Sequence, residues 1–167
     1  KLSELKELFT NAIVSSANVL LIIGICAGFS WVLTYNNFPA AVTSLILNIS
    51  SSKLVIVLLI NIIFLIGGMF MEGLALILMF VPIFMPVMAS VGVSPMTFGV
   101  MVLINVVIGT LTPPVGVCLF VASSISGASV TRIGKAVLPF VLCMLFVMFL
   151  VVAVPGIATW IPSLMSA

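Results

Sequence analysis

The sequence predicts an all-α integral membrane protein, on the evidence of its composition, its long apolar runs and the glycines and prolines that interrupt two of these runs. Apolar residues make up 64% of the 167 residues and charged residues only 5%, which is far from the balance of a water-soluble domain. The charged side chains lie mostly at the ends of apolar runs, so the net charge of +2 indicates membrane topology and not nucleic-acid binding.

The sequence offers little for catalysis or for a transition metal. It has no histidine, and its three cysteines lie inside apolar runs without the spacing of metal ligands or a disulfide framework. A cluster of serines near residue 125 invites comparison with intramembrane serine proteases, but the general base that such enzymes need is missing. We therefore expect no enzyme activity. The chain does not begin with methionine, which suggests a fragment or a processed segment, and we expect it to be a piece of a larger chain or complex.

The first 53 residues predict one membrane span followed by a connecting helix. Residues 12–35 are apolar and long enough to cross a bilayer, with Trp31 and Tyr35 as interfacial aromatic residues near the end. Residues 36–39 stop this helix. Residues 40–53 are too short and too polar to cross, so we expect an interfacial arm helix, with a plain surface loop as the alternative.

Residues 54–89 predict a helical hairpin, because about 36 residues at about 1.5 Å each would extend well past a hydrocarbon core of about 30 Å. The interruption is GGMFMEG at residues 67–73, where Gly67 and Gly68 could adopt the left-handed conformation that ends a helix. The arms on either side come to about 20 and 22 Å, both short of a comfortable crossing. This favours a re-entrant hairpin, with two tilted short spans as the alternative.

Three polar side chains lie within these apolar runs. Glu72 is the one acidic residue in the apolar body of the chain; it either caps its own helix or takes part directly in an ion site. Asn61 and Asn105 are more typical of contacts between helices than of ligands, although Asn105 lies one turn before the next interruption. Pro82 and Pro86 are expected to bend the second arm of the hairpin.

Residues 109–116, with the sequence GTLTPPVG, predict a break within a membrane helix. Pro113 and Pro114 lack N–H groups and clash with the preceding turn, and Thr112 is pushed out of the α region because a proline follows it. The apolar runs 95–108 and 117–125 flank the break, which places it at mid-membrane depth if the two together span. Backbone groups freed at that depth need protein, water or a ligand as partners.

The two sides of this break suit opposite charges. The carbonyls of Gly109 and Thr110 lose their helical donors and suit a hard cation, together with the hydroxyls of Thr110 and Thr112. The second half-helix begins with free N–H groups at Gly116 and Val117 and suits an anion. This geometry is typical of ion-coupled transporters with discontinuous helices, and a proline kink without a ligand is the alternative. For each hydroxyl, a bond back to its own helix is the alternative.

Two sets of candidate residues follow. We expect a cation to be bound by the residues of the hairpin tip and of the break, namely Gly67, Gly68, Gly109, Thr110, Thr112 and Pro113. We expect the substrate to be bound by Asn105, Thr112, Gly116 and Val117, with Glu72 as an additional candidate.

The last segment fixes the expected orientation. Arg132 and Lys135 precede a final apolar span over residues 136–154, which Pro155 and Trp160 end at an interface. Because cytoplasmic loops prefer basic residues, the stretch 131–135 is placed inside and Lys53 outside. A re-entrant hairpin and two short spans over residues 54–89 both return the chain to the side from which it entered. The orientation therefore does not decide between them.

Taken together, the motifs at residues 67–73, 82–86, 109–116 and 119–123 resemble the C-terminal half of the large membrane subunit of tripartite ATP-independent periplasmic (TRAP) transporters. The resemblance implies an elevator-type, Na⁺-coupled importer of organic anions, such as C4-dicarboxylates or sialic acid, in the bacterial inner membrane. It thereby implies Na⁺ as the cation at the candidate residues given above. It also implies three partners: a periplasmic substrate-binding protein, a small membrane subunit and the other half of the large subunit, because the chain resembles only the second of two inverted repeats.

The resemblance divides the chain into four parts. Residues 1–53 form a scaffold span and the interfacial arm helix, 54–90 the re-entrant hairpin, 91–130 the discontinuous helix and 131–167 the C-terminal span. Two other classes of function stay open at this point. One is a binding-protein-independent anion/Na⁺ symporter of similar architecture, and the other is a membrane scaffold subunit that does not transport.

Overall fold

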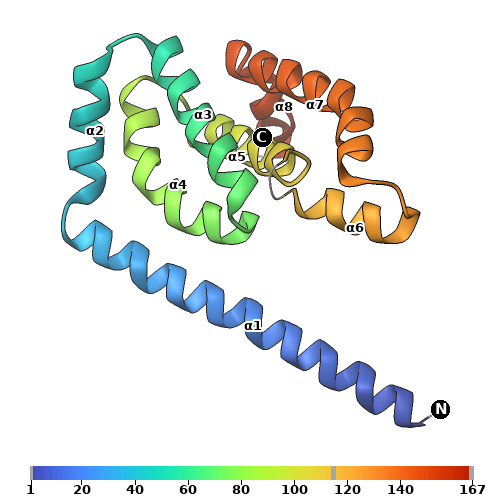
Figure 1. The fold of residues 1–167 in the computed structure, drawn as a ribbon. Coiled ribbons are helices and arrows are strands. Elements are labelled where there is room, and N and C mark those ends of the chain that lie inside the picture. Colours follow the sequence, from blue (N-terminus) through green and yellow to red (C-terminus); the bar gives the residue numbers. More distant parts are fainter. Residues whose placement is uncertain (1, 114–115, 166–167) are drawn as a thin grey trace.

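The described residues, 2–113 and 116–165, are arranged as eight α-helices without a strand in a computed structural model (Figure 1). In chain order the helices are α1 (Leu2–Tyr35), α2 (Phe38–Ile49), α3 (Lys53–Phe70), α4 (Gly73–Ser90), α5 (Pro95–Thr110), α6 (Val117–Ser126), α7 (Val130–Ala153) and α8 (Gly156–Met165). In this part of the chain, α3, α4, α7 and the stretch of α1 from Leu5 are long and apolar enough to cross a membrane. The predicted all-helical membrane class is confirmed.

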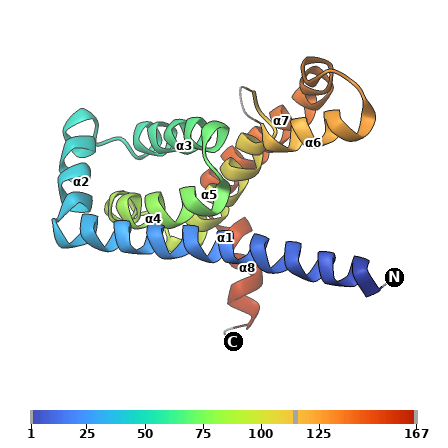
Figure 2. The same cartoon turned by 60° about the horizontal axis from the view of Figure 1, so that its bottom comes forward.

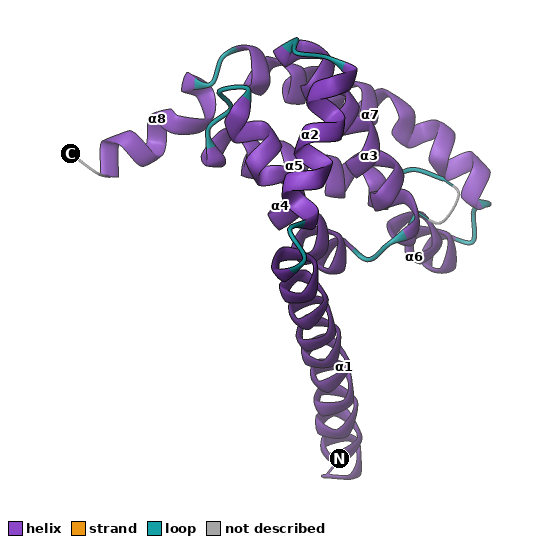
Figure 3. Ribbon diagram, turned by 90° about the vertical axis from the view of Figure 1, so that its left-hand side faces the viewer, coloured by secondary structure: helices purple, strands orange, loops and turns teal. Residues whose placement is uncertain are grey.

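Helix α1 is the long helix that projects from the rest of the structure (Figure 3). It passes along α4 (Figure 2), where Cys26 is buried and the Ser30 hydroxyl donates to the carbonyl of Leu78 at 2.7 Å. The helix begins before the expected span of residues 12–35 and includes the charged residues Glu4, Lys6 and Glu7. Helix α1 ends at Tyr35, and Asn37, at a φ of 56°, turns the chain into α2.

Helix α2 stands beside α4 and connects the end of α1 to the start of α3 (Figure 1). Its bounds differ from the expected 40–53, because Pro39 fits the first turn of a helix and Ser50 is extended. Pro39 and Ile46 are buried, whereas Leu45 and Ile49 are exposed.

Helices α3 and α4 form a hairpin, which packs with α5 around an aromatic cluster. The ring of Phe64 on α3 lies 5.8 to 6.1 Å, centroid to centroid, from the rings of Phe80 and Phe84 on α4 and of Phe98 on α5. All three contacts are edge-to-face, the arrangement that the charge distribution of aromatic rings favours. This cluster fixes the two arms of the hairpin against the helix that leads to the break.

The hairpin turn lies later in the sequence and contains fewer residues than the expected interruption at residues 67–73. Gly67 and Gly68 were expected to end the first arm in the left-handed conformation, but both lie inside α3, which continues to Phe70. The turn consists of Met71 and Glu72. Each arm therefore has 18 residues, which corresponds to about 27 Å instead of the expected 20 and 22 Å.

The glycines serve close packing instead of turning the chain. A Cβ added at Gly67 would lie 2.6 Å from Cδ1 of Leu76 on α4, and one added at Gly73 would lie 2.5 Å from Cγ1 of Val106 on α5. One added at Gly109 on α5 would lie 2.5 to 2.7 Å from the backbone of Gly68 on α3. The three helices can approach this closely only where side chains are missing.

The C-terminal helices support α5 from the other side. Helix α7 packs along α5 and α6, and α8 packs on α5 and α7. The tail after residue 155 was expected only to end the last span at an interface, but it forms α8.

We predict that Gly109→Ala destabilises the protein, because the new methyl group would collide with the Gly68 backbone, which cannot move like a flexible side chain. Overpacking of this kind costs about 1–3 kcal/mol. Gly99→Ala on the same helix is the matched control, since its Cβ would meet nothing within 4 Å. Thermal unfolding of the full-length protein in detergent should show a lower midpoint for Gly109→Ala alone. Equal midpoints for the two variants would contradict the close contact.

Candidate ion and substrate site

The break between α5 and α6 leaves the carbonyl of Thr110 without a helical donor. The last turn of α5 tightens, since the N–H groups of Leu111 and Thr112 donate to the carbonyls of Ile108 and Gly109, each at 3.1 Å. The carbonyl of Thr110 would need an N–H from residue 113 or 114, and both are prolines. Pro114 and Val115, which belong to the predicted break, lie outside the described residues.

The end of the hairpin lies at the level of this break. Gly68, in the last turn of α3, contacts Gly109, in the last turn of α5. Farther back on the same two helices, Asn61 of α3 contacts Asn105 of α5. From the first contact to the second, the residue numbers increase on both helices. Helices α3 and α5 therefore run in the same direction and end side by side. The structure thus brings Gly68 and Gly109 together, whereas Gly67 turns toward α4.

Asn61 and Asn105 form a buried amide pair between α3 and α5. The Asn105 amide donates to the side-chain oxygen of Asn61 and to the Met101 carbonyl, and the Asn61 amide donates to the Val57 carbonyl and to the sulfur of Met101. Asn105 is fully buried, and its side-chain oxygen has no hydrogen-bond partner among the described residues. The predicted role between helices is the one seen here. A substrate could reach Asn105 only if α3 and α5 separated.

The two threonine hydroxyls of the predicted ion site donate to their own helix. Thr110 Oγ1 donates to the Val107 carbonyl at 2.8 Å, and Thr112 Oγ1 donates to the Ile108 carbonyl at 2.6 Å. A hydroxyl that donates keeps its lone pairs, so each remains able to accept a bond or to coordinate a cation.

The second half-helix is held against the break from two sides. Gly116 is buried with a φ of 39°, and its carbonyl accepts from the N–H of Leu119 at 2.7 Å. A Cβ at Gly116 would lie 3.1 Å from the Thr112 carbonyl oxygen, and one at Gly134 of α7 would lie 3.8 Å from both Leu119 and Pro113. Val117 is exposed. Gly134 of α7 thus lies beside both Pro113, after α5, and Leu119, in the first turn of α6.

Glu72 sits at the start of α4 and caps it. One of its carboxylate oxygens accepts a hydrogen bond from the N–H of Ala75 at 3.0 Å. A carboxylate at this position also interacts favourably with the helix dipole. The capping role that the sequence left open is therefore present in the structure.

The sequence analysis expected Asn61 and Asn105 to lie between helices, but it missed that they pair with each other and that α7 supports the break. Asn61 lies seven residues before Gly68 and Asn105 four before Gly109, so each amide shares a helix face with the glycine that follows. That spacing could have indicated that these faces of α3 and α5 pack against each other. Nothing in the sequence singles out Gly134 as the residue that lies against the break.

Comparison with known proteins decides the family. Residues 1–157 match the family described as "Tripartite ATP-independent periplasmic transporter, DctM component". The chain belongs to this DctM family. It is 38% identical over 143 residues to the isethionate TRAP transporter permease protein DctMQ of Oleidesulfovibrio alaskensis, covering 86% of this chain and 22% of that protein. It is 35% identical over 158 residues to the sialic acid TRAP transporter large permease protein SiaM of Vibrio cholerae, covering 95% of this chain and 37% of SiaM.

A third relative lacks an assigned function. The uncharacterized protein YgiK of Salmonella typhimurium is 37% identical over 162 residues, which is 97% of this chain and 37% of YgiK. The chain thus spans less than two fifths of the length of these curated relatives. No solved structure matches it significantly. Family membership and the candidate spans identify this DctM chain as a multi-pass protein of the bacterial inner membrane.

We predict that Glu72→Gln leaves the stability of the protein close to that of the wild type, because a neutral side-chain oxygen can still cap α4. Glu72→Ala should lower the stability by about 0.5–2 kcal/mol through loss of the cap. Thermal unfolding in detergent measures both variants. Equal unfolding midpoints for Glu72→Ala and the wild type would contradict the capping role.

We predict that Asn61 and Asn105 are energetically coupled. Asn61→Leu removes the acceptor of the buried Asn105 amide, and an unsatisfied buried group costs about 1–3 kcal/mol. Because the double Leu variant leaves no amide behind, its loss of stability should be smaller than the sum of the two single losses. Unfolding of the four proteins of this double-mutant cycle measures the coupling. Additive losses would mean that the hydrogen bond contributes nothing to stability.

Proposed function

We propose that this chain is the second inverted repeat of a TRAP large permease and forms one half of an elevator-type importer of organic anions coupled to Na⁺. The observation that carries the proposal is the interruption between Thr110 and Val117, which lies beside the end of the α3–α4 hairpin. The freed carbonyl of Thr110, the hydroxyl lone pairs of Thr110 and Thr112 and the N-terminus of α6 all belong to this interruption. Discontinuous helices in secondary transporters use such groups to bind ions and substrates.

The proposed Na⁺ site consists of the carbonyls of Gly109 and Thr110 with the Thr112 hydroxyl, next to Gly68. These are oxygen atoms, which hard cations prefer. The N–H groups at the start of α6, from Val117 onward, are the proposed contact for the anionic group of the substrate. Because Asn105 is enclosed between α3 and α5, its role in this proposal is to hold the two helices together.

Several features support a hairpin and a broken helix that move as one body. Contact between the backbones of Gly68 and Gly109, the amide pair and the cluster around Phe64 join α3 to α5 along most of their length. The hairpin would then carry the ion site with it and would not open against α5. Such a body is the unit that an elevator mechanism requires.

The position of the break along α7 favours an ion site near the cytoplasmic side in this conformation. Pro113 lies opposite Gly134, the fifth residue of α7, which stands between Arg132 and Lys135. These basic residues mark the inner boundary under the positive-inside rule. We therefore propose that the break, expected at mid-membrane depth, lies closer to the inside here.

The substrate class and the partners are proposed from the relatives. Two of them are named as transporters of isethionate and of sialic acid, and a further DctM relative of Vibrio cholerae as a C4-dicarboxylate transporter. All three substrates are organic anions. By analogy, this chain would work with a periplasmic binding protein, with a small membrane subunit and with the remaining half of the large subunit.

We predict that Thr112→Ala raises the Na⁺ concentration for half-maximal uptake by about tenfold, because about 1.4 kcal/mol of ligand interaction is lost. The break would persist, so expression should stay close to normal. Thr112→Ser keeps the hydroxyl and is the matched control. Uptake of the transported anion into proteoliposomes that contain the complete transporter, at varied Na⁺, measures the effect.

Replacing Pro113 and Pro114 together by alanine tests the break itself. Each interior proline costs a helix about 3 kcal/mol, so the double variant would let the helix close over the site. Na⁺-dependent uptake should be lost more completely than in Thr112→Ala. Wild-type Na⁺ dependence in the double variant would show that the break is only a kink, and the proposed ion site would be wrong.

A further inference from the structure

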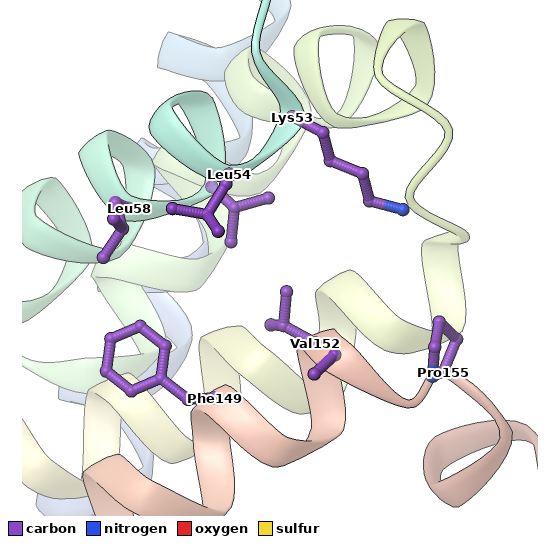
Figure 4. Close-up of a pocket in the computed structure, with 8 residues that line it drawn as sticks. Lys53, Leu54, Leu58, Phe149, Val152 and Pro155 are labelled. Carbon is purple, nitrogen blue, oxygen red and sulfur yellow. The ribbon is translucent and has the colours of Figure 1, made fainter.

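A groove of about 460 Å³ lies between the first turns of α3 and the last turns of α7 (Figure 4). Its lining residues are Lys53, Leu54, Val57, Leu58, Phe149, Val152, Ala153 and Pro155. All of them except Lys53 are apolar. The volume falls within the range of about 300–1,000 Å³ that is common for small-ligand sites.

The groove has a charge at one end and an apolar body. In Figure 4, Lys53 extends along one end of the groove, whereas Leu58 and Phe149 face each other across the other end. The Lys53 ammonium group donates to the Gly92 carbonyl at 3.3 Å, a partner that does not neutralise it. Glu72 lies at the opposite end of α3, about 27 Å away along the helix. The other acids, Glu4 and Glu7, lie in the first turns of α1.

The position of the groove matches a membrane boundary. Lys53 begins α3, Gly92 lies in the turn between α4 and α5, and Pro155 follows the end of α7, so several helix ends meet at one level. The groove extends from that level alongside two apolar helices that are each long enough to cross a membrane. Lysine at such a boundary keeps its ammonium group at the polar surface while its stem covers apolar surface.

We propose that this groove binds one anionic phospholipid, with its phosphate at the Lys53 ammonium group and an acyl chain between Leu58 and Phe149. An extended protein segment is a poorer occupant, because its backbone N–H and C=O groups would need partners that these walls do not offer. A helix satisfies its own backbone, but an apolar helix would leave the Lys53 ammonium group without an anion, and the crosslink described below tests for it. A free phosphate ion would leave the apolar body of the groove unfilled. A phospholipid matches both ends, and the membrane supplies it at this depth.

The test uses the full-length permease in its assembled transporter, in phosphatidylcholine bilayers that contain a small fraction of phosphatidylglycerol with a photoactivatable acyl chain. After illumination, mass spectrometry measures the label in the peptides that carry residues 53–58 and 149–155. Labelling of residues 13–25 of α1, whose side chains are largely exposed, reports contact with bulk lipid. We expect the groove peptides to show saturable labelling that unlabelled phosphatidylglycerol prevents and phosphatidylcholine does not.

Four variants make the result specific. Lys53→Gln should reduce the groove labelling at least fivefold, and Val152→Trp should do the same by filling the groove. Lys53→Arg keeps the charge and should retain the labelling even if it alters folding slightly. Lys135→Gln removes a cation at the other end of α7 and should change nothing in the groove.

Two results would overturn the proposal. One is groove labelling that is indifferent to headgroup charge and to Lys53→Gln, which would reduce the groove to ordinary lipid-facing surface. The other is a protein–protein crosslink from a photoreactive residue placed at Leu58, which would show that another part of the transporter covers the groove. Neither result depends on Na⁺-coupled uptake, so the proposed transport function is tested separately.

Discussion

The structure depends on the contact between the backbones of Gly68 and Gly109. A membrane offers little hydrophobic driving force between helices, so close packing and interhelical hydrogen bonds must hold them together. A side chain at Gly109 would collide with the main chain of Gly68 itself. Removing both side chains lets α3 and α5 end side by side, and it brings the hairpin turn to the level of the helix break. The position of the candidate ion site follows from this single contact.

Asn61 and Asn105 make the contact specific to one register. Glycine faces alone would permit α3 to slide along α5 by a turn, since their apolar neighbours differ little in chemistry. A buried amide tolerates no such shift, because every unsatisfied polar group in an apolar surrounding costs free energy. The pair therefore sets the height of Gly68 opposite Gly109. The side-chain oxygen of Asn105 still lacks a partner among the described residues, which makes this the least satisfied point of the interface.

The sequence predicted the helical class, the hairpin and the site of the break, because apolar length and proline chemistry are local properties. It misplaced the hairpin turn for an equally physical reason. Gly67 and Gly68 suit either a left-handed turn or a close helix crossing, and only their neighbours decide between the two. Gly109, which contacts Gly68, is distant in sequence, and Leu76 faces Gly67 only because the chain folds back at Met71 and Glu72. The packing of Gly134 against Pro113 was likewise invisible, because it joins two helices through positions without a recognisable pattern.

A broken helix in a membrane is stable only when other groups supply the backbone hydrogen bonds that the prolines remove. Here these hydrogen bonds are supplied unequally at the end of α5 and at the start of α6. On the N-terminal side, Leu111 and Thr112 still donate within the last turn of α5, so the loss concentrates on the Thr110 carbonyl. On the C-terminal side, Gly116 accepts from Leu119, while its left-handed conformation points the chain into α6. The Thr110 oxygen therefore lacks a helical donor, one residue after the Gly109 that packs on Gly68. A cation that binds there would supply the missing partner, which ties ion binding to the stability of the break.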